Sequence, residues 1–347
     1  MISNENEVGA QGSSRTRNLP GREYGSLISL NDRPLEDWFI MNKRNASLSV
    51  TVDIEDWYHI PSVCGSSFST YPDVDGFFKH WHGRYDYLTE PTMRVLTLLD
   101  RYHITATFFV VADVVEHYPG LVESIVDQGH EIACHGLHHE CKIDSVTKKP
   151  RFGRDDFEER TRKAKRILEK VSGERVVGYR APNALIGGWM LDSLEKIGFL
   201  YDSSVCVNSF YNKTDSMLNG VSTDPYHPKI HGLESTINSD RSFIEFPWAH
   251  LDIGMKIPTS GGPMLRFLGA HIIQKGIHQS LSRGHTVFYF HPIDLSHETF
   301  PKVGNKRRFY WIIKGSVVED RVKQILDGNS SVQYTCLRDY VEDGYGL

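Results

Sequence analysis

The stretch SLSVTVDIED, residues 47–56, predicts how the fold begins. Its first six residues alternate polar with apolar side chains and include β-branched residues, which is typical of a β-strand. Three carboxylates follow: Asp53 and Glu55 share one face of an extended chain, and Asp56 joins them where the strand has ended. Clustered carboxylates repel one another unless a cation or an arginine is present, although a polar turn after a strand gives the same pattern.

Strands and helices alternate along the rest of the chain, which favours a parallel α/β layout. We expect one catalytic domain, residues 46–347, after a polar and partly disordered extension, residues 1–45. Polar residues cluster where the predicted strands end, and this is the face on which barrels of parallel strands carry active sites. The predicted strands are 47–52, 105–111, 130–135, 176–180 and 286–290, and the predicted helices are 90–102, 119–128, 157–171, 190–198, 264–283 and 317–326.

The composition excludes several classes of protein. The 347 residues include 44 acidic and 39 basic side chains, so a basic excess for nucleic-acid binding is missing. A content of 39% apolar and 24% charged residues is that of an ordinary globular protein. The 17 histidines point to metal or proton chemistry, because histidine is the commonest metal ligand and titrates near neutral pH.

The sequence also bears on the cellular compartment. It has no apolar run long enough for a transmembrane helix, and the N-terminal residues lack the apolar core of a secretory signal. The five cysteines are widely spaced and odd in number, which indicates reduced thiols. We therefore expect a cytoplasmic protein, with peripheral membrane association and the oligomeric state left open.

A second cluster, HGLHH at residues 135–139, contains two histidines four residues apart. One helical turn or a tight loop can aim His135 and His139 at one ion. Cys134 and Cys141 flank them, which raises the alternative of a structural zinc site. That alternative is disfavoured because Cys134 would point away from His135 on a strand, so buried and unreactive thiols are the simpler interpretation.

Two further residues stand at the ends of predicted strands. Arg180, stiffened by Pro182, can hold a carboxylate through its planar guanidinium. His291 follows an apolar strand and precedes Pro292. Taken singly, a surface arginine and a core histidine explain these two residues.

The four clusters in this order resemble the polysaccharide deacetylase superfamily, also called the NodB-homology group or carbohydrate esterase family 4. The stretches SVTVDIEDWYH and EFPWAHLDIGMKIPTSGG are similar to its exopolysaccharide-associated branch, which has a DxEDW motif. The resemblance covers roughly residues 46–340. It implies a distorted (β/α) barrel of about seven parallel strands and a divalent metal, usually zinc, with other divalent ions as alternatives.

The resemblance also implies roles for individual residues. Asp53 matches the catalytic base of the family, and Arg180 matches the arginine that orients this base. His135 and His139 match two metal ligands. His291 matches the histidine that acts as general acid.

The third metal ligand is left open by a departure from the family pattern. The common motif has two adjacent aspartates, whereas Ile54 follows Asp53 here. Glu55, on the same strand face as Asp53, and Asp56 are both candidates, and strand geometry favours Glu55.

The resulting hypothesis is a metal-dependent hydrolase that removes an N-acetyl group from a sugar in a glycan or glycan precursor, such as a lipid-linked or nucleotide-linked sugar. An alternative is an amidohydrolase of the same superfamily that acts on a small non-sugar amide or ureide. A second alternative is an inactive glycan-binding barrel.

Overall fold

The structure is a computed structural model that describes residues 46–60, 63–64, 69–80, 86–144, 146–215, 218, 221–236, 241–298 and 312–345. They belong to one compact unit, Ile40–Leu347. The predicted polar extension, residues 1–45, lies outside the described residues.

The first strand, β1 (Ser47–Ile54), lies inside the sheet. It pairs in parallel with β2 (Thr107–Val110) through its second half and with β9 (Thr286–Phe290) through its first half. All eight residues of β1 are buried, the polar ones included. Both sides of a parallel sheet are covered. The polar and the apolar side chains of β1 therefore lie on two faces that are both packed, and neither face meets solvent.

The sheet closes into a distorted barrel. Its parallel strands follow the order β9-β1-β2-β3-β4-β5-β6, and a parallel bridge between Trp248 and Val287 joins the segment after β6 to β9. The short β10 (Gln333–Tyr334) pairs with the start of β1. These seven strands confirm the predicted (β/α) barrel. The remaining strands of the circuit are β3 (Glu131–Cys134), β4 (Gly178–Tyr179), β5 (Tyr201–Asp202) and β6 (Ile244–Glu245).

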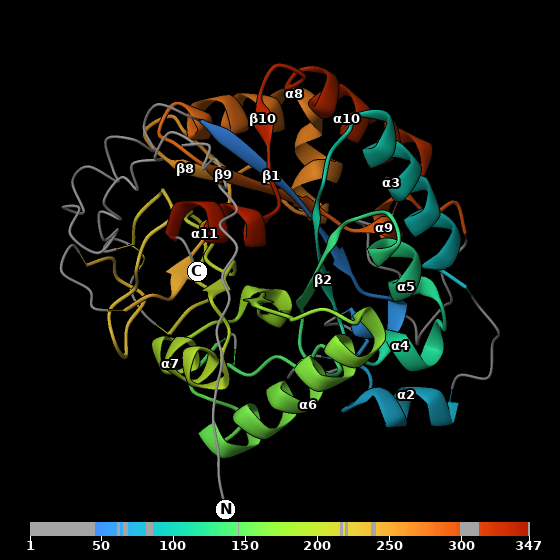
Figure 1. The fold of residues 1–347 in the computed structure, drawn as a ribbon, viewed down its shortest axis with the longest axis vertical. Helices are drawn as coiled ribbons and strands as arrows, with labels where there is room; N and C mark the ends of the chain where they lie inside the picture. Colours follow the sequence, from blue (N-terminus) through green and yellow to red (C-terminus); the bar gives the residue numbers. More distant parts are fainter. Residues whose placement is uncertain are drawn as a thin grey trace, which may run out of the picture. The chain divides into compact units, whose positions relative to one another are not determined.

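Helices surround the barrel (Figure 1). The six predicted helices correspond to α3 (Thr89–Arg101), α5 (Leu121–Val126), α6 (Arg154–Ser172), α7 (Gly188–Ile197), α8 (Gly262–Leu281) and α10 (Ser316–Asp327). Elements that the pattern did not predict are the helices η2 (Trp57–His59), α2 (Val74–His80), α4 (Val114–His117), η3 (Pro182–Ala184), α9 (Pro292–Leu295) and α11 (Leu337–Tyr345), and the antiparallel hairpin of β7 (His250–Asp252) and β8 (Lys256–Pro258). Across the described ranges, no helix combines the length and apolar character needed to cross a membrane.

The core has an outer and an inner part. Leu48, Val50 and Val52 of β1 pack in a large cluster with apolar residues of the surrounding helices. A second cluster contains residues from β2, β3, β5, β6 and β9 together with Leu337 and Val341 of α11. The unpredicted C-terminal helix α11 therefore supplies apolar side chains to the core formed with these strands.

A buried histidine fixes the start of β1. The Nδ1 atom of His285 lies 2.8 Å from Ser47 Oγ, and its Nε2 atom lies 3.3 Å from Ser49 Oγ. The ring of Tyr340 packs on the imidazole with centroids 4.2 Å apart. Burial lowers the pKa of His285 to about 3, so the folded protein holds this ring neutral at ordinary pH.

This histidine makes the stability of the protein depend on pH. An unfolded histidine has a pKa of about 6.5, so between pH 6.5 and 3 the unfolded state binds a proton at His285 that the folded state does not. Acidification across this window therefore lowers the free energy of unfolding by up to about 1.4 kcal/mol per pH unit. The H285Q side chain stays neutral at every pH. Between pH 7 and pH 5, we therefore expect the free energy of unfolding of H285Q, measured in urea titrations, to fall by roughly 2 kcal/mol less than that of the wild-type protein. Equal losses in both proteins would contradict the assignment.

Candidate active site

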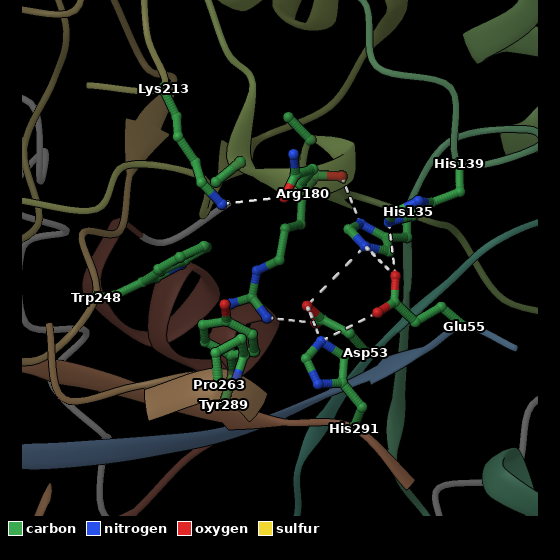
Figure 2. A pocket seen from close by; sticks show the side chains of 13 residues that line it. Asp53, Glu55, His135, His139, Arg180, Lys213, Trp248, Pro263, Tyr289 and His291 are labelled. Carbon is green, nitrogen blue, oxygen red and sulfur yellow. Dashed lines mark hydrogen bonds and ion pairs between the residues drawn. The ribbon is translucent and has the colours of Figure 1, made fainter. Parts of the chain in front are cut away.

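A polar pocket opens at the carboxyl ends of the barrel strands (Figure 2). Asp53 lies within the last two residues of β1, and His135, Arg180 and His291 each follow directly after β3, β4 and β9. This is the edge at which parallel β/α barrels gather functional side chains from distant segments. The pocket is lined by Asp53, Glu55, His135, His139, Arg180, Ala181, Asn183, Ala184, Lys213, Trp248, Pro263, Tyr289 and His291.

Asp53 and Arg180 form a buried ion pair, with Arg180 Nη1 2.5 Å from Asp53 Oδ1. The same Nη1 donates to Thr51 Oγ1, while Nε and Nη2 donate to the carbonyl and the hydroxyl oxygen of Ser203. The guanidinium also lies over the Phe109 ring, 4.0 Å from its centroid. Its position is therefore set from four directions, and Asp53 Oδ2 is left facing the pocket.

Glu55, His135 and His139 converge on one point. Glu55 Oε2 lies 2.7 Å from His139 Nε2 and 4.0 Å from His135 Nε2. One ligand atom from each of the three residues lies within 4.8 Å of the others. Burial alone would raise the pKa of Glu55, but His139, His291 and His135 hold it well below its usual range. An ionised carboxylate and two imidazoles form a donor set suited to zinc.

The two histidines are held by different means. His135 Nδ1 donates to the carbonyl oxygen of Arg180 at 2.8 Å, which leaves Nε2 directed at the pocket. Burial lowers the pKa of His135 to about 4, against the opposing charge of Asp53. The turn between them requires Gly136 at φ 85° and His139 itself at φ 56°. A metal-binding imidazole is usually oriented by a hydrogen bond from its other ring nitrogen, as His135 is by its Nδ1.

Asp56, the other candidate ligand, faces a different environment. Its Oδ1 accepts from the Trp57 amide at 2.6 Å, and its Oδ2 accepts from the Tyr118 hydroxyl. Its own amide donates to His59 Nδ1 at 2.9 Å, so Asp56 caps the short helix η2. Of the two carboxylates that the sequence left open, the structure places Glu55 beside His135 and His139 and places Asp56 in this cap.

His291 faces Glu55 from the end of the neighbouring strand, β9. Its Nε2 lies 3.3 Å from Glu55 Oε1 and 3.9 Å from Asp53 Oδ2. Its Nδ1 lies 2.9 Å from Asp294 Oδ2, and Asp294 in turn is paired with the buried Arg266. Burial alone would lower the pKa of His291, but Glu55 and Asp294 raise it to about 9. The imidazole is therefore a cation at neutral pH.

The remaining histidine of the HGLHH cluster points elsewhere. His138 Nδ1 lies 2.8 Å from Asp113 Oδ2, and His59 Nε2 lies 2.8 Å from Asp113 Oδ1. Cys134 and Cys141 are buried free thiols whose pKa burial raises to about 12. A site that needs thiolates is disfavoured by such surroundings.

The sequence analysis did not identify several residues of the site. Asp294 stands three residues after His291, a spacing that brings two side chains together at the start of a helix. Arg266 and Lys213 carry no comparable signal, because each reaches the site from a segment with no recognisable motif. Tyr289 lies on the predicted strand 286–290, but nothing in the sequence marks it as a pocket residue. Trp248 lies in the pocket wall, and its indole N–H donates to the Ser203 carbonyl at 2.9 Å.

Two family models match the chain. Residues 79–201 match the model described as polysaccharide deacetylase. Residues 218–342 match a domain of unknown function (DUF3473). The first match contains His135, His139 and Arg180, and the second contains His291.

Several curated proteins are similar to parts of the chain. A peptidoglycan deacetylase of Helicobacter pylori is 29% identical over 154 residues, which are 42% of this chain and 50% of that protein. A peptidoglycan deacetylase-like protein of Gibberella zeae is 37% identical over 114 residues, 32% of each chain. The chain thus spans a third to a half of the length of these relatives.

Solved structures share the fold at low sequence identity. A putative polysaccharide deacetylase from Mycobacterium smegmatis superimposes with a TM-score of 0.56 and 20% identity, covering 86% of this chain and 90% of the other. An allantoinase gives a TM-score of 0.55 with 15% identity, covering 94% and 99%. The DxEDW branch within the family stays a prediction. The family-model match and the curated relatives support membership of the polysaccharide deacetylase superfamily, the NodB-homology group, and the solved structures show that the barrel fold is shared.

Proposed function

We propose that the protein is a metal-dependent N-deacetylase that acts on an N-acetylated sugar in a glycan or glycan precursor. One observation carries the proposal: three candidate metal ligands lie beside an arginine-held carboxylate and His291 in one pocket. Family membership supports the same reaction class, since both curated relatives described above are named as, or after, peptidoglycan deacetylases.

The donor set of the pocket fits a divalent cation. Glu55, His135 and His139 would hold it, and fewer than four protein ligands leave room for substrate, as in catalytic zinc sites. The Nε2 atom of His139 faces Glu55 at 2.7 Å. Its Nδ1 atom is buried and has no hydrogen-bond partner among the described residues. A bound zinc or similar ion would supply a Lewis acid for the acetamide carbonyl.

Asp53 is placed to act as general base. Arg180 holds Oδ1, while Oδ2 faces the gap between His135 and His291 at 4.0 and 3.9 Å. A water molecule in this gap would give its proton to Oδ2 as its oxygen attacks the carbonyl carbon. Arginine-held carboxylates of this kind keep a fixed geometry for proton transfer.

His291 is placed to act as general acid. Its Nε2 points into the pocket, and the Asp294–Arg266 pair behind Nδ1 keeps the ring oriented. The C–N bond of the tetrahedral intermediate breaks as Nε2 gives its proton to the departing amine, and acetate remains. An imidazolium with a pKa raised to about 9 stays protonated at neutral pH until this step.

Two alternative functions have specific support or a specific test. An allantoinase shares the fold, which makes hydrolysis of a small ureide the first alternative. An inactive glycan-binding barrel would need none of the charged groups at the pocket. The cytoplasmic location, a lipid or nucleotide link on the substrate, and the DxEDW branch all stay predictions.

Acetate release from N-acetylated substrates tests the reaction class. We expect the zinc-loaded protein to release acetate from N-acetylglucosamine oligomers or their glycan precursors and to leave allantoin intact. Ureide cleavage without acetate release would favour the amidohydrolase alternative. Tight metal binding without acetate release or ureide cleavage would contradict both the deacetylase and the amidohydrolase hypotheses.

Removal of the acid or the base should abolish most activity. We expect D53N and H291A each to lower kcat by about 10²–10⁴-fold, because each removes one proton-transfer group. H138Q is a matched control, since His138 contacts Asp113 and not the pocket. Metal content and circular dichroism should match the wild-type protein. Near-normal rates in folded, metal-loaded D53N would overturn the assignment of the base.

Metal affinity distinguishes the two candidate carboxylates. We expect E55Q to weaken zinc binding by at least tenfold in competition with a chelator, because it removes a charged ligand. D56N should bind zinc like the wild-type protein, because the carboxylate of Asp56 caps η2 and receives the Tyr118 hydroxyl. The reverse result would assign the metal to Asp56.

A further inference from the structure

One cation in the pocket has no role in the proposed reaction. Lys213 lines the pocket together with Glu55 and His139. Figure 2 shows its ammonium directed toward the middle of the pocket, on the far side of Arg180 from Glu55 and His139. The Lys213 ammonium donates to Asn183 Oδ1 at 3.0 Å. The ammonium also lies 5.6 Å from the centroid of the Tyr211 ring. Among the described residues, Lys213 forms no ion pair within 4 Å, so its ammonium has N–H donors left for a ligand.

The segment that carries Lys213 is held in place. The Asn208 side chain accepts from the amides of Phe210 and Tyr211 at 2.9 and 2.8 Å. Lys148 donates to the carbonyl oxygen of Asn212, and Asp215 accepts from the Gly188 amide at the start of α7. These bonds on both sides of Lys213 fix the backbone from which its side chain extends, so the ammonium is preorganised for a ligand.

The charges of the pocket leave Lys213 as a surplus cation. Arg180 is paired with Asp53, and the Glu55 carboxylate lies 2.7 Å from His139 Nε2 and 3.3 Å from His291 Nε2. A divalent cation at Glu55 would increase the positive charge further. Burial lowers the pKa of Lys213, with Glu55 among the groups that oppose this shift. Lys213 is partly buried, and a partly buried cation without a carboxylate partner is stabilised when an anion binds beside it.

From this geometry we infer that the substrate carries an anionic group next to its acetamide and that Lys213 binds this group. The inference rests on the proposed function, because it places the acetamide at the Glu55–His135–His139 side of the pocket. The anion would then lie on a ring carbon adjacent to the one that bears the acetamide. Two groups satisfy this requirement: a phosphate on the anomeric carbon, and the carboxylate of a lactyl ether on the ring carbon at the other side of the acetamide-bearing carbon.

The small residues beside Lys213 leave space for such a group. Ala181 and Ala184 line the same pocket as Arg180 and Lys213, and Asn183 takes a left-handed backbone conformation, with φ 55°. The Asn183 side chain bonds the ammonium from one side only. Charge-assisted hydrogen bonds of an ammonium to phosphate or carboxylate are about twice as strong as neutral ones, so Lys213 would select anionic over neutral sugars.

Equilibrium binding tests this inference separately from catalysis. We would measure zinc-loaded H291A protein, which turns over slowly, by calorimetry against N-acetylglucosamine 1-phosphate, N-acetylmuramic acid and neutral N-acetylglucosamine. At least one anionic sugar should bind about 10- to 100-fold more tightly than the neutral sugar. K213M in the same background should remove this preference. K256M is the matched control: Lys256 lies in β8 outside the pocket, so the preference should persist.

Each outcome has a definite meaning. A Lys213-dependent preference for the phosphate or for the carboxylate identifies the source of the anion. Equal affinity for all three sugars, or a preference that survives K213M, overturns the inference. Acetate release by the wild-type protein is scored independently. If the anion preference depends on Lys213 but no sugar releases acetate, the deacetylase proposal fails and the anion site stands.

Discussion

The site depends on the buried ion pair of Asp53 and Arg180. These residues lie 127 positions apart, and neither is more than 3% exposed. Breaking such a pair leaves a charge without a partner in the protein interior, which costs several kcal/mol. Arg180 also receives the His135 imidazole on its carbonyl oxygen and donates to Ser203. One side chain and its backbone therefore set the relative positions of the residues at the ends of β1, β3, β4 and β5.

The structure also shows what the segment matched to the domain of unknown function contributes to the barrel. Residues 218–342 contain β6 and β9, which continue the sheet begun by β1 to β5, and they belong to the same compact unit. This segment also brings His291, Asp294 and Arg266 to the pocket. The polysaccharide deacetylase match, residues 79–201, contains neither Asp53 nor His291. Neither matched segment holds the whole site, so both are parts of one barrel.

Periodicity predicted the parallel α/β layout because its long elements have strong patterns, and the family resemblance implied the barrel. The helix 157–171 and the strand 286–290 reappear as α6 and β9 with small changes at their ends. The two-residue strands β4, β5 and β6 and the C-terminal helix α11 depend on contacts that are distant in sequence, so periodicity gives no guide to their limits. The polar face of β1 illustrates the same limit. Its alternation indicates a strand but does not show that both faces are covered, and the structure buries the strand on both faces.

Side chains at strand ends were predictable where a motif carried them, and charge balance explains the rest. A charged group buried in the barrel needs an ion-pair or hydrogen-bond partner. Arg266 is the partner of Asp294, and Ser203 accepts a hydrogen bond from Arg180. No local pattern encodes such partners, because they need only a suitable charge at a suitable distance. Glu55 and Lys213 differ from them. The Glu55 carboxylate is shared among three histidines, and the Lys213 ammonium donates to the neutral amide oxygen of Asn183. Groups whose pairing within the described chain is incomplete are the ones on which ligand binding acts most strongly, because a ligand supplies the partner that folding did not.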